Sequence, residues 1–304
     1  MNNSDEKIGF NDPNQHNEEQ INLVEPGYWD FPAVFSSPHS GQIYSDSFLT
    51  QTILDPVDLR RSEDFCVDEL FEHVSELGAP LLAAHFPRAY CDVNRAANEL
   101  DTGMFEGSLP LSQGHQSARV HAGLGVIPSR INEDLNIYSG KVPSKEAVQR
   151  LEQCYHPYHK ALKKLLYHGQ ILFDPLLLID CHSMPGHLGD KGQRFYLADI
   201  VLGSRFKTSC PVHILDFVAQ KFREHGLTVS YDEPYAGGYI TQTYSLPARG
   251  TYTLQIELNR NLYMLPGRLE KNSNFTSLQS SIRQIMTELK ACLISTQSLK
   301  QAAE

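Results

Sequence analysis

The feature that most constrains the fold of this chain is an unbroken apolar run at residues 176–179, which leads directly into Asp180-Cys181-His182-Ser183. Such a run is typical of a strand that is buried on both faces, as in a parallel sheet covered by helices. In open α/β sheets, functional groups collect just outside the carboxyl ends of the strands. His182 stands at that position.

Two other segments repeat this arrangement. The apolar residues 33–35 lead into Ser36-Ser37-Pro38-His39, and the strand-like run 253–258 contains Glu257 and leads into Asn259-Arg260. Two histidines and a glutamate are thus each presented at or near the end of an apolar strand. This set favours a metal-dependent hydrolase.

The rest of the chain alternates between strand and helix patterns. Residues 81–84 and 89–93 are predicted to form a neighbouring pair of strands. Helices are predicted from Ser144, as a cap, to about Tyr167, from Val212 to Glu224, and from Thr276 or Ser277 towards Leu299. The alternation predicts a mainly parallel sheet. We expect one catalytic α/β domain over residues 21–304, preceded by a flexible polar tail over residues 1–20.

Composition narrows the class of protein further. The formal net charge of −10 disfavours a nucleic-acid partner, because phosphate binding requires a basic surface. The sequence has no run long enough to span a membrane and no signal-peptide pattern at its start. The six cysteines are scattered without a C-x-x-C pair, which indicates reduced thiols in a cytoplasmic protein. The oligomeric state cannot be read from the sequence.

A catalytic zinc ion needs about three protein ligands, and neutral histidine is a good one. His39 and His182 supply two, and a carboxylate is wanted as the third. Gln42 stands three residues after His39, where an acid would complete a compact motif. The nearest acidic cluster contains Asp64 and Asp68, and both are candidates.

The carboxylate of Glu257 lies in an otherwise apolar strand, where an unpaired charge is costly. It is either the salt-bridge partner of Arg260 or a general base whose pKa is tuned by burial. Asn94 and Arg95, with Arg88 earlier in the chain, form a further polar group. An arginine fork can bind a carboxylate in a bidentate manner, although each arginine could also be an ordinary surface residue.

Six short motifs occur along roughly residues 30–290: Ser37-Pro38-His39-Ser40-Gly41, Asp92-Val93-Asn94-Arg95, Asp180-Cys181-His182-Ser183-Met184-Pro185, Ala198-Asp199-Ile200-Val201-Leu202-Gly203, Pro234-Tyr235-Ala236-Gly237-Gly238-Tyr239-Ile240-Thr241 and Leu254-Gln255-Ile256-Glu257-Leu258-Asn259-Arg260-Asn261-Leu262-Tyr263-Met264. In this set and order the chain resembles the N-formylglutamate amidohydrolase (deformylase) family, which is related in fold to the zinc carboxypeptidases and aspartoacylase. The resemblance implies a three-layer α/β/α fold around a mixed, mainly parallel sheet, with one catalytic zinc ion.

The resemblance also implies roles for individual residues. His39 and His182 become zinc ligands and Glu257 the base. Because Gln42 replaces the glutamate of the wider superfamily's His-x-x-Glu motif, the third ligand must come from elsewhere, and Asp64 is favoured over Asp68.

On the substrate side, the resemblance makes Asn94 and Arg95 the pair that binds a substrate carboxylate, and Arg88 the group that polarises the scissile carbonyl. The implied reaction releases formate from N-formyl-L-glutamate, the last step of a histidine-degradation route, and the partner is this small-molecule N-acyl amino acid.

Two alternatives remain open. One is a zinc deacylase or carboxypeptidase that acts on another N-acyl amino acid or a short peptide. The other is a metal-free binding protein, which Gln42 suggests. A cysteine hydrolase built on Cys181 and His182 is disfavoured, because adjacent residues on a strand point to opposite faces.

Overall fold

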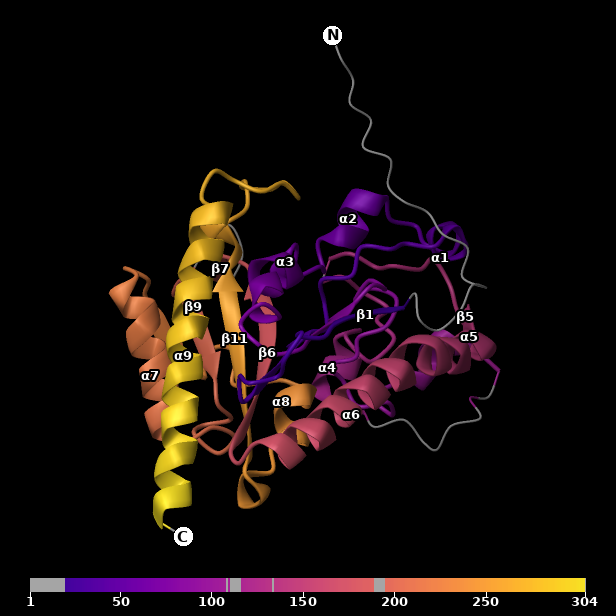
Figure 1. Cartoon of the computed structure of the whole chain (residues 1–304). Helices are drawn as coiled ribbons and strands as arrows, with labels where there is room; N and C mark the ends of the chain where they lie inside the picture. The colour runs from indigo at the N-terminus through magenta and orange to yellow at the C-terminus, as the bar shows by residue number, and fades with distance from the viewer. Residues whose placement is uncertain (1–19, 108, 110–115, 133, 189–194, 304) are drawn as a thin grey trace.

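The computed structural model describes residues 20–107, 109, 116–132, 134–188 and 195–303 (Figure 1). The predicted tail therefore lies outside the described residues, apart from Gln20. The carbonyl of Gln20 accepts a hydrogen bond from the backbone N–H of His85 at 3.0 Å.

A seven-stranded mixed sheet forms the centre of the molecule. In spatial order its strands are β1 (Ile21–Val24), β3 (Leu81–Ala84), β2 (Ala33–Ser37), β6 (Leu176–Met184), β11 (Thr251–Asn259), β9 (Ile200–Gly203) and β10 (Val229–Tyr231). The four strands β3, β2, β6 and β11 are mutually parallel, β1 is antiparallel at one edge, and β9 with β10 runs antiparallel to β11 at the other. Two ribbons, β4 (Phe105–Glu106) with β5 (Val142–Pro143) and β7 (His187–Leu188) with β8 (Phe195–Tyr196), lie outside this sheet.

Helices cover both faces of the sheet (Figure 1). The core on one face joins β2, β6 and β11 to α3 (Val67–Phe71), α7 (Val212–Glu224) and α9 (Phe275–Ala303). The core on the other face joins the same sheet to α5 (Ser144–Arg150), α6 (His156–Leu172) and α8 (Tyr239–Tyr244). The short helices α1 (Asp46–Gln51) and α2 (Pro56–Arg60) contribute Phe48 and Leu59 to a separate small core, and α4 (Ala118–His121) is a further short helix. The predicted three-layer α/β/α architecture with a mixed, mainly parallel sheet is confirmed.

The central strand β6 is buried along its whole length, as its apolar run predicts. Side chains alternate between the two faces, so Cys181 packs in the core beneath α7 and α9 while His182 points to the opposite side. Strand β11 lies beside β6 in parallel register, with Glu257 directly opposite His182. The register therefore brings two of the predicted functional residues together near the carboxyl ends of adjacent strands.

Of the predicted helices, α7 has the predicted bounds, and α9 begins at Phe275, one or two residues before the predicted start at Thr276 or Ser277. The helix predicted from Ser144 continues to Leu172 through a π-helical turn at Leu151–Tyr155, and its N-cap is Pro143 and not Ser144. No helix in the described part of the chain is both long enough and apolar enough to cross a bilayer.

The strand predicted over residues 89–93 is wrong. This segment is an irregular loop whose backbone bonds to a turn and to a second loop: the N–H of Tyr90 donates to Pro87 at 2.9 Å, and that of Asp92 to Val126 at 2.8 Å. Ala89, Cys91 and Val93 are buried, so their apolar alternation reflects packing beneath the loop and not pairing in a sheet.

Candidate active site and metal centre

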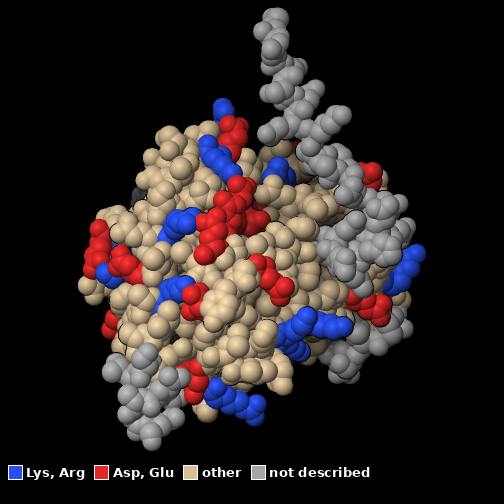
Figure 2. Space-filling view, viewed as in Figure 1, with Lys and Arg blue, Asp and Glu red and all other residues tan. Residues whose placement is uncertain are grey.

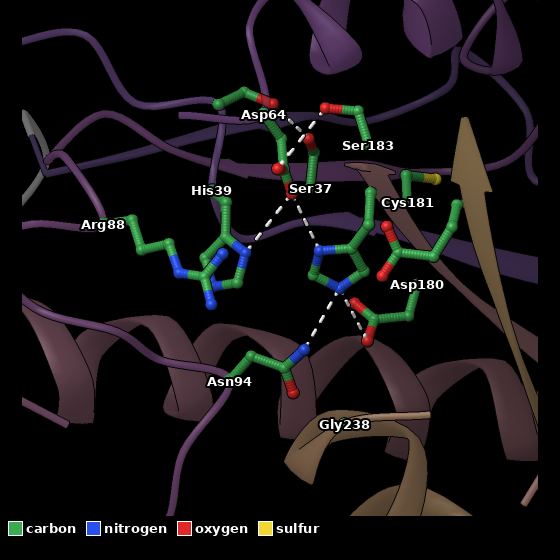
Figure 3. Close-up of polar contacts among 12 residues, drawn as sticks. Ser37, His39, Asp64, Arg88, Asn94, Asp180, Cys181, Ser183 and Gly238 are labelled. Atoms are coloured by element: carbon green, nitrogen blue, oxygen red, sulfur yellow. Dashed lines mark hydrogen bonds and ion pairs between the residues drawn. The ribbon is translucent and has the colours of Figure 1, made fainter. Parts of the chain in front are cut away.

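Three loops and strands converge on one buried group. His39 lies two residues after the end of β2, His182 lies near the end of β6, and Asp64 lies in the connection between α2 and α3. The backbone N–H of Asp64 donates to the carbonyl of His39 at 3.0 Å, which fixes this connection beside β2. All three side chains are at most 3% exposed. A dashed line in Figure 3 joins the imidazole of His39 to the carboxylate of Asp64. Non-local contacts between loops therefore assemble the group.

Two further carboxylates orient the imidazole rings. Nε2 of His39 lies 2.7 Å from Asp92 Oδ1, and Nε2 of His182 lies 3.1 Å from Asp180 Oδ2. An acidic partner favours the tautomer that carries its proton on Nε2, and Nδ1 then keeps its lone pair. Both Nδ1 atoms face Oδ2 of Asp64, at 3.3 Å from His39 and 2.9 Å from His182.

This arrangement fits a bound metal ion. His39, Asp64 and His182 each offer one ligand atom, and these atoms lie within 4.8 Å of one another. Nδ1 of His39 is buried and has no hydrogen-bond partner among the described residues, which is unusual for a polar atom unless another group occupies the space before it. Two imidazoles and one carboxylate, with acidic partners behind the rings, form a ligand set typical of catalytic zinc.

The charges of this group are strongly coupled. Burial acts to raise the pKa of Asp64, but the neighbouring imidazoles of His182 and His39 hold that pKa well below its usual range. Burial likewise opposes the charge of Asp92, and Arg95, His39 and Arg88 outweigh it and keep its pKa low. Both carboxylates are therefore ionised at neutral pH, as metal coordination and second-sphere contacts require.

The carboxylate of this group belongs to Asp64 and not to Asp68. Asp68 lies in the first turn of α3, where burial raises the pKa of its carboxyl to about 6, and it is not part of the group. Gln42 points elsewhere: its Oε1 accepts a hydrogen bond from Arg60 at 3.0 Å. Asp64 can thus supply the third ligand atom, although Gln42 is not an acid.

Glu257 is buried beside this group, and its partner is not Arg260. The guanidinium of Arg260 contacts Asp64 Oδ1 at 3.1 Å. Oε1 of Glu257 instead accepts a hydrogen bond from Gln255 Nε2 at 2.8 Å, and Oε1 of Gln255 accepts one from the backbone N–H of Gly238 at 2.7 Å. Burial raises the pKa of Glu257 to about 7, a value suited to a group that both takes and returns a proton.

The contact from Gln255 leads to a testable prediction. A hydrogen bond to the ionised carboxylate stabilises its charged form, so Gln255→Leu is expected to raise the pKa of Glu257. The acid limb of the kcat/KM profile for the hydrolysis that the resemblance implies should shift upward by on the order of one pH unit. Gln255→Glu, which adds a like charge, should shift it further. An acid limb at the same pH in all three proteins would contradict this role.

The structure places Arg88 and Asn94 around the same group. Nε of Arg88 donates to Asp92 Oδ2 at 3.1 Å. The amide nitrogen of Asn94 lies 3.1 Å from Nε2 of His182, while its oxygen accepts a hydrogen bond from the N–H of Ile240 at 2.8 Å. Asn94 therefore lies between His182 and the first turn of α8.

Arg95 is also buried beside the group, and its donors contact protein oxygens. Its Nε donates to the carbonyl of Leu124 at 2.9 Å and its Nη1 to that of Asn94 at 2.8 Å, while Nη2 lies 3.4 Å from Asp92 Oδ2. Burial lowers the pKa of this guanidinium to about 10. Arg95 thus stabilises the loop that carries Asp92 and Asn94.

Cys181 takes no part in this site. In Figure 3 the sulfur of Cys181 points away from His39 and Asp64. Its thiol contacts the carbonyl of Ile179 at 3.8 Å within the core on the other face of the sheet, and burial raises its pKa well above the usual value. All six cysteines are free thiols.

A cleft of about 670 Å³ opens onto the His39–Asp64–His182 group. Three carboxylates line it, Asp64, Asp92 and Glu257, together with seven arginines: Arg61, Arg88, Arg95, Arg119, Arg130, Arg205 and Arg260. Acidic and basic side chains are interspersed on the outer face that Figure 2 shows, and the chain as a whole carries a formal charge of −10. The excess of cationic groups is thus a local property of the cleft, which favours an anionic ligand.

The fold and the site define a class: an α/β/α protein with a buried His-Asp-His group and a glutamate at the carboxyl edge of a mixed sheet. A family model described as N-formylglutamate amidohydrolase matches residues 31–264. The chain belongs to this family.

Individual relatives agree with this assignment. The chain is similar to an N-formylglutamate deformylase of Pseudomonas putida, with 27% identity over 86% of this chain and 91% of the relative. A deformylase of Pseudomonas aeruginosa is 26% identical over 77% of this chain and 82% of its own length. A crystal structure of N-formylglutamate amidohydrolase from Ralstonia eutropha superposes with a TM-score of 0.85 and 32% identity, covering 91% of this chain and 99% of that one.

Proposed function

We propose that this chain is a zinc-dependent amidohydrolase that releases formate from N-formyl-L-glutamate to give L-glutamate. The observation that carries the proposal is the buried His39–Asp64–His182 group, which lies beside Glu257 in an arginine-lined cleft. The names of the relatives support the substrate. As working proposals, we assign the activity to one domain over residues 21–304, the reaction to the end of histidine degradation, and the protein to the cytoplasm, where free thiols persist.

His39, Asp64 and His182 would hold the metal ion. When bound, zinc would supply Lewis-acid activation of water and of the formyl carbonyl. Glu257 takes a proton from the attacking water and returns it to the nitrogen of the leaving amine, so the C–N bond breaks and formate and glutamate form. Arg88 lines the same cleft and donates to the oxyanion that develops on the formyl oxygen.

Asn94 and Arg95 are proposed to bind one substrate carboxylate. Both line the cleft, and the contacts of Arg95 with neighbouring carbonyls hold it in place. A guanidinium that is fixed in advance loses less conformational entropy when the ligand binds.

Metal analysis together with a formate-release assay tests the proposal. The purified protein is expected to contain one zinc ion per chain, to release formate from N-formyl-L-glutamate, to lose activity to a chelator and to regain it with zinc. Faster turnover of another N-acyl amino acid or a short peptide in a substrate panel would favour the deacylase or carboxypeptidase alternative. A protein that binds neither zinc nor another divalent metal would favour the metal-free alternative.

The contact of Arg95 with substrate makes a separate prediction. Arg95→Ala is expected to raise the KM for N-formylglutamate by on the order of 10- to 100-fold, because a desolvated carboxylate loses its partner. Arg95→Lys keeps the charge but not the fork, so its KM should lie in between. The comparison with a substrate whose carboxylate is replaced by an amide is decisive. The two such substrates are N-formylglutamate α-amide and N-formylglutamine. If Arg95→Ala prefers N-formylglutamate over both of them as strongly as wild type does, another cation binds that carboxylate.

A further inference from the structure

Arg205 reaches the cleft from a backbone segment with an unusual conformation. Arg205, Phe206 and Lys207 directly follow the residue after β9, and all three have left-handed φ angles of 51°, 58° and 65°. Residues with a Cβ atom rarely adopt this region, and three in succession persist only where the surroundings enforce them. Contacts with neighbouring residues must therefore hold this segment in place.

A buried carboxylate enforces this conformation. Asp232, which is 8% exposed, accepts hydrogen bonds from the backbone N–H of Ser204 at 2.6 Å and from its hydroxyl at 2.9 Å. The Ser204 hydroxyl in turn accepts from the N–H of Lys207 at 2.8 Å, and the N–H of Arg205 donates to the carbonyl of Ala236 at 2.7 Å. These bonds fix the direction in which the Arg205 side chain leaves the backbone.

The absence of a side chain at Gly237 leaves room for the Arg205 side chain. A Cβ atom at this glycine would lie 2.8 Å from Cγ2 of Thr241 and 3.1 Å from Cδ of Arg205, and its φ of 114° suits only glycine. Gly237 also accepts a hydrogen bond through its carbonyl from Nη1 of Arg205 at 3.3 Å. The neighbouring Gly238 packs against Asn94 in the same way, since a Cβ there would meet the Asn94 amide at 2.4 Å. The glycine pair thus lies between Arg205 and Asn94.

The guanidinium of Arg205 differs from others in the cleft. Arg88, Arg95 and Arg260 each contact a carboxylate of the protein. Among the described residues, the guanidinium of Arg205 donates a hydrogen bond only to the carbonyl of Gly237, so most of its N–H donors remain for a ligand. Arg119 also lines the cleft, but it is exposed on the short helix α4 and lacks such a supporting segment.

We propose that Arg205 binds a second carboxylate of the substrate, so that the cleft selects N-acyl derivatives of amino acids with two carboxylates. This inference rests on the proposed function and deepens it. It assigns the opposite ends of a dianionic substrate to two guanidiniums, Arg95 and Arg205, with the scissile amide beside Glu257.

Kinetics with two mono-amides test this role. Arg205→Gln is expected to raise the KM for N-formylglutamate by on the order of 10- to 100-fold, with a smaller change in kcat and an unchanged melting temperature. N-formylglutamate α-amide lacks the α-carboxylate, and N-formylglutamine lacks the side-chain carboxylate. One of the two should be as good a substrate for the variant as for wild type, and the carboxylate that it lacks is the one that Arg205 binds. Equal losses on both mono-amides and the parent, or no loss on any, would overturn the proposal. Arg205→Lys serves if the glutamine variant does not fold, and Arg268→Gln, outside the cleft, is the matched control.

A binding measurement separates this proposal from the proposed function. Calorimetric titration with glutarate, a dicarboxylate that cannot be hydrolysed, should give a Kd on the order of 10- to 100-fold weaker for Arg205→Gln than for wild type. If wild type binds glutarate through Arg205 but does not release formate, the proposed function fails and the role of Arg205 stands. Equal glutarate binding in both proteins, or none in either, counts against Arg205.

Discussion

His182→Ala is expected to lose both the bound metal and the hydrolytic activity while it keeps the fold. Its Nδ1 lies 2.9 Å from Asp64 Oδ2, so the substitution removes one of three ligands from a buried site. Lewis-acid activation by a metal lowers the activation free energy by several kcal/mol. Without it, turnover should fall by about 10³-fold or more. Metal content by mass spectrometry and the formate-release rate give the two readouts.

The charge balance of the site calls for two companion variants. His182→Ala leaves Asp180 without its imidazole partner, so His182→Gln is measured beside it to retain a polar side chain. His213→Ala, at an exposed position in α7, should keep full zinc content and turnover. Circular dichroism and the melting temperature verify that each variant folds. A folded His182→Ala protein that retains one zinc ion per chain and normal turnover would remove His182 from the ligand set.

The alternation of side chains along strands accounts for what the sequence made predictable. The run at residues 176–179 identifies β6, and its ending identifies His182. The same rule held a further signal: residues two apart on a strand share a face, so Asp180 lies with His182 and Gln255 with Glu257. The positions of Asp180 and Gln255 beside these residues could therefore be predicted from the sequence, although the sequence analysis assigns neither a role.

The loop contacts of the site had no such local signal. Asp64 meets His39 because the connection between α2 and α3 folds back onto the end of β2. Asp92 reaches His39 from a segment whose apolar alternation predicted a strand. Such pairings depend on tertiary packing, and a sequence pattern with period 2 carries no information about them.

The alternatives for Glu257 could likewise be separated only in three dimensions. Arg260 lies three residues further on, a spacing that allows a salt bridge. It begins a 3₁₀ turn after β11, and its side chain turns towards Asp64, with Nε also donating to the Ser183 hydroxyl at 3.1 Å. Among the described residues, Glu257 accepts its side-chain hydrogen bond from the amide of Gln255, and its carboxylate remains available for proton transfer.

Glu257→Gln is expected to lower turnover by at least ~10²-fold, the lower end for general acid–base catalysis. The amide has the shape of the carboxylate and its oxygen can still accept the hydrogen bond from Gln255, but it cannot take a proton from water. Zinc content and KM for N-formylglutamate should change little. Steady-state formate release and metal analysis test these expectations, with the exposed Glu270→Gln as control.

The stability of the metal-free protein distinguishes catalysis from a structural role for Glu257. Burial raises its pKa from 4.5 to about 7 in the folded state, so the folded protein holds a proton that the unfolded chain releases. The contribution of Glu257 to the free energy of unfolding therefore falls as the pH rises from about 4.5 to about 7. Glu257→Gln removes that loss, and relative to wild type the variant should gain stability across this interval. If Glu257 were instead a structural partner, the variant would melt at a lower temperature at neutral pH while turnover survived. Unfolding curves at two pH values and one rate measurement therefore distinguish a general base from a structural residue.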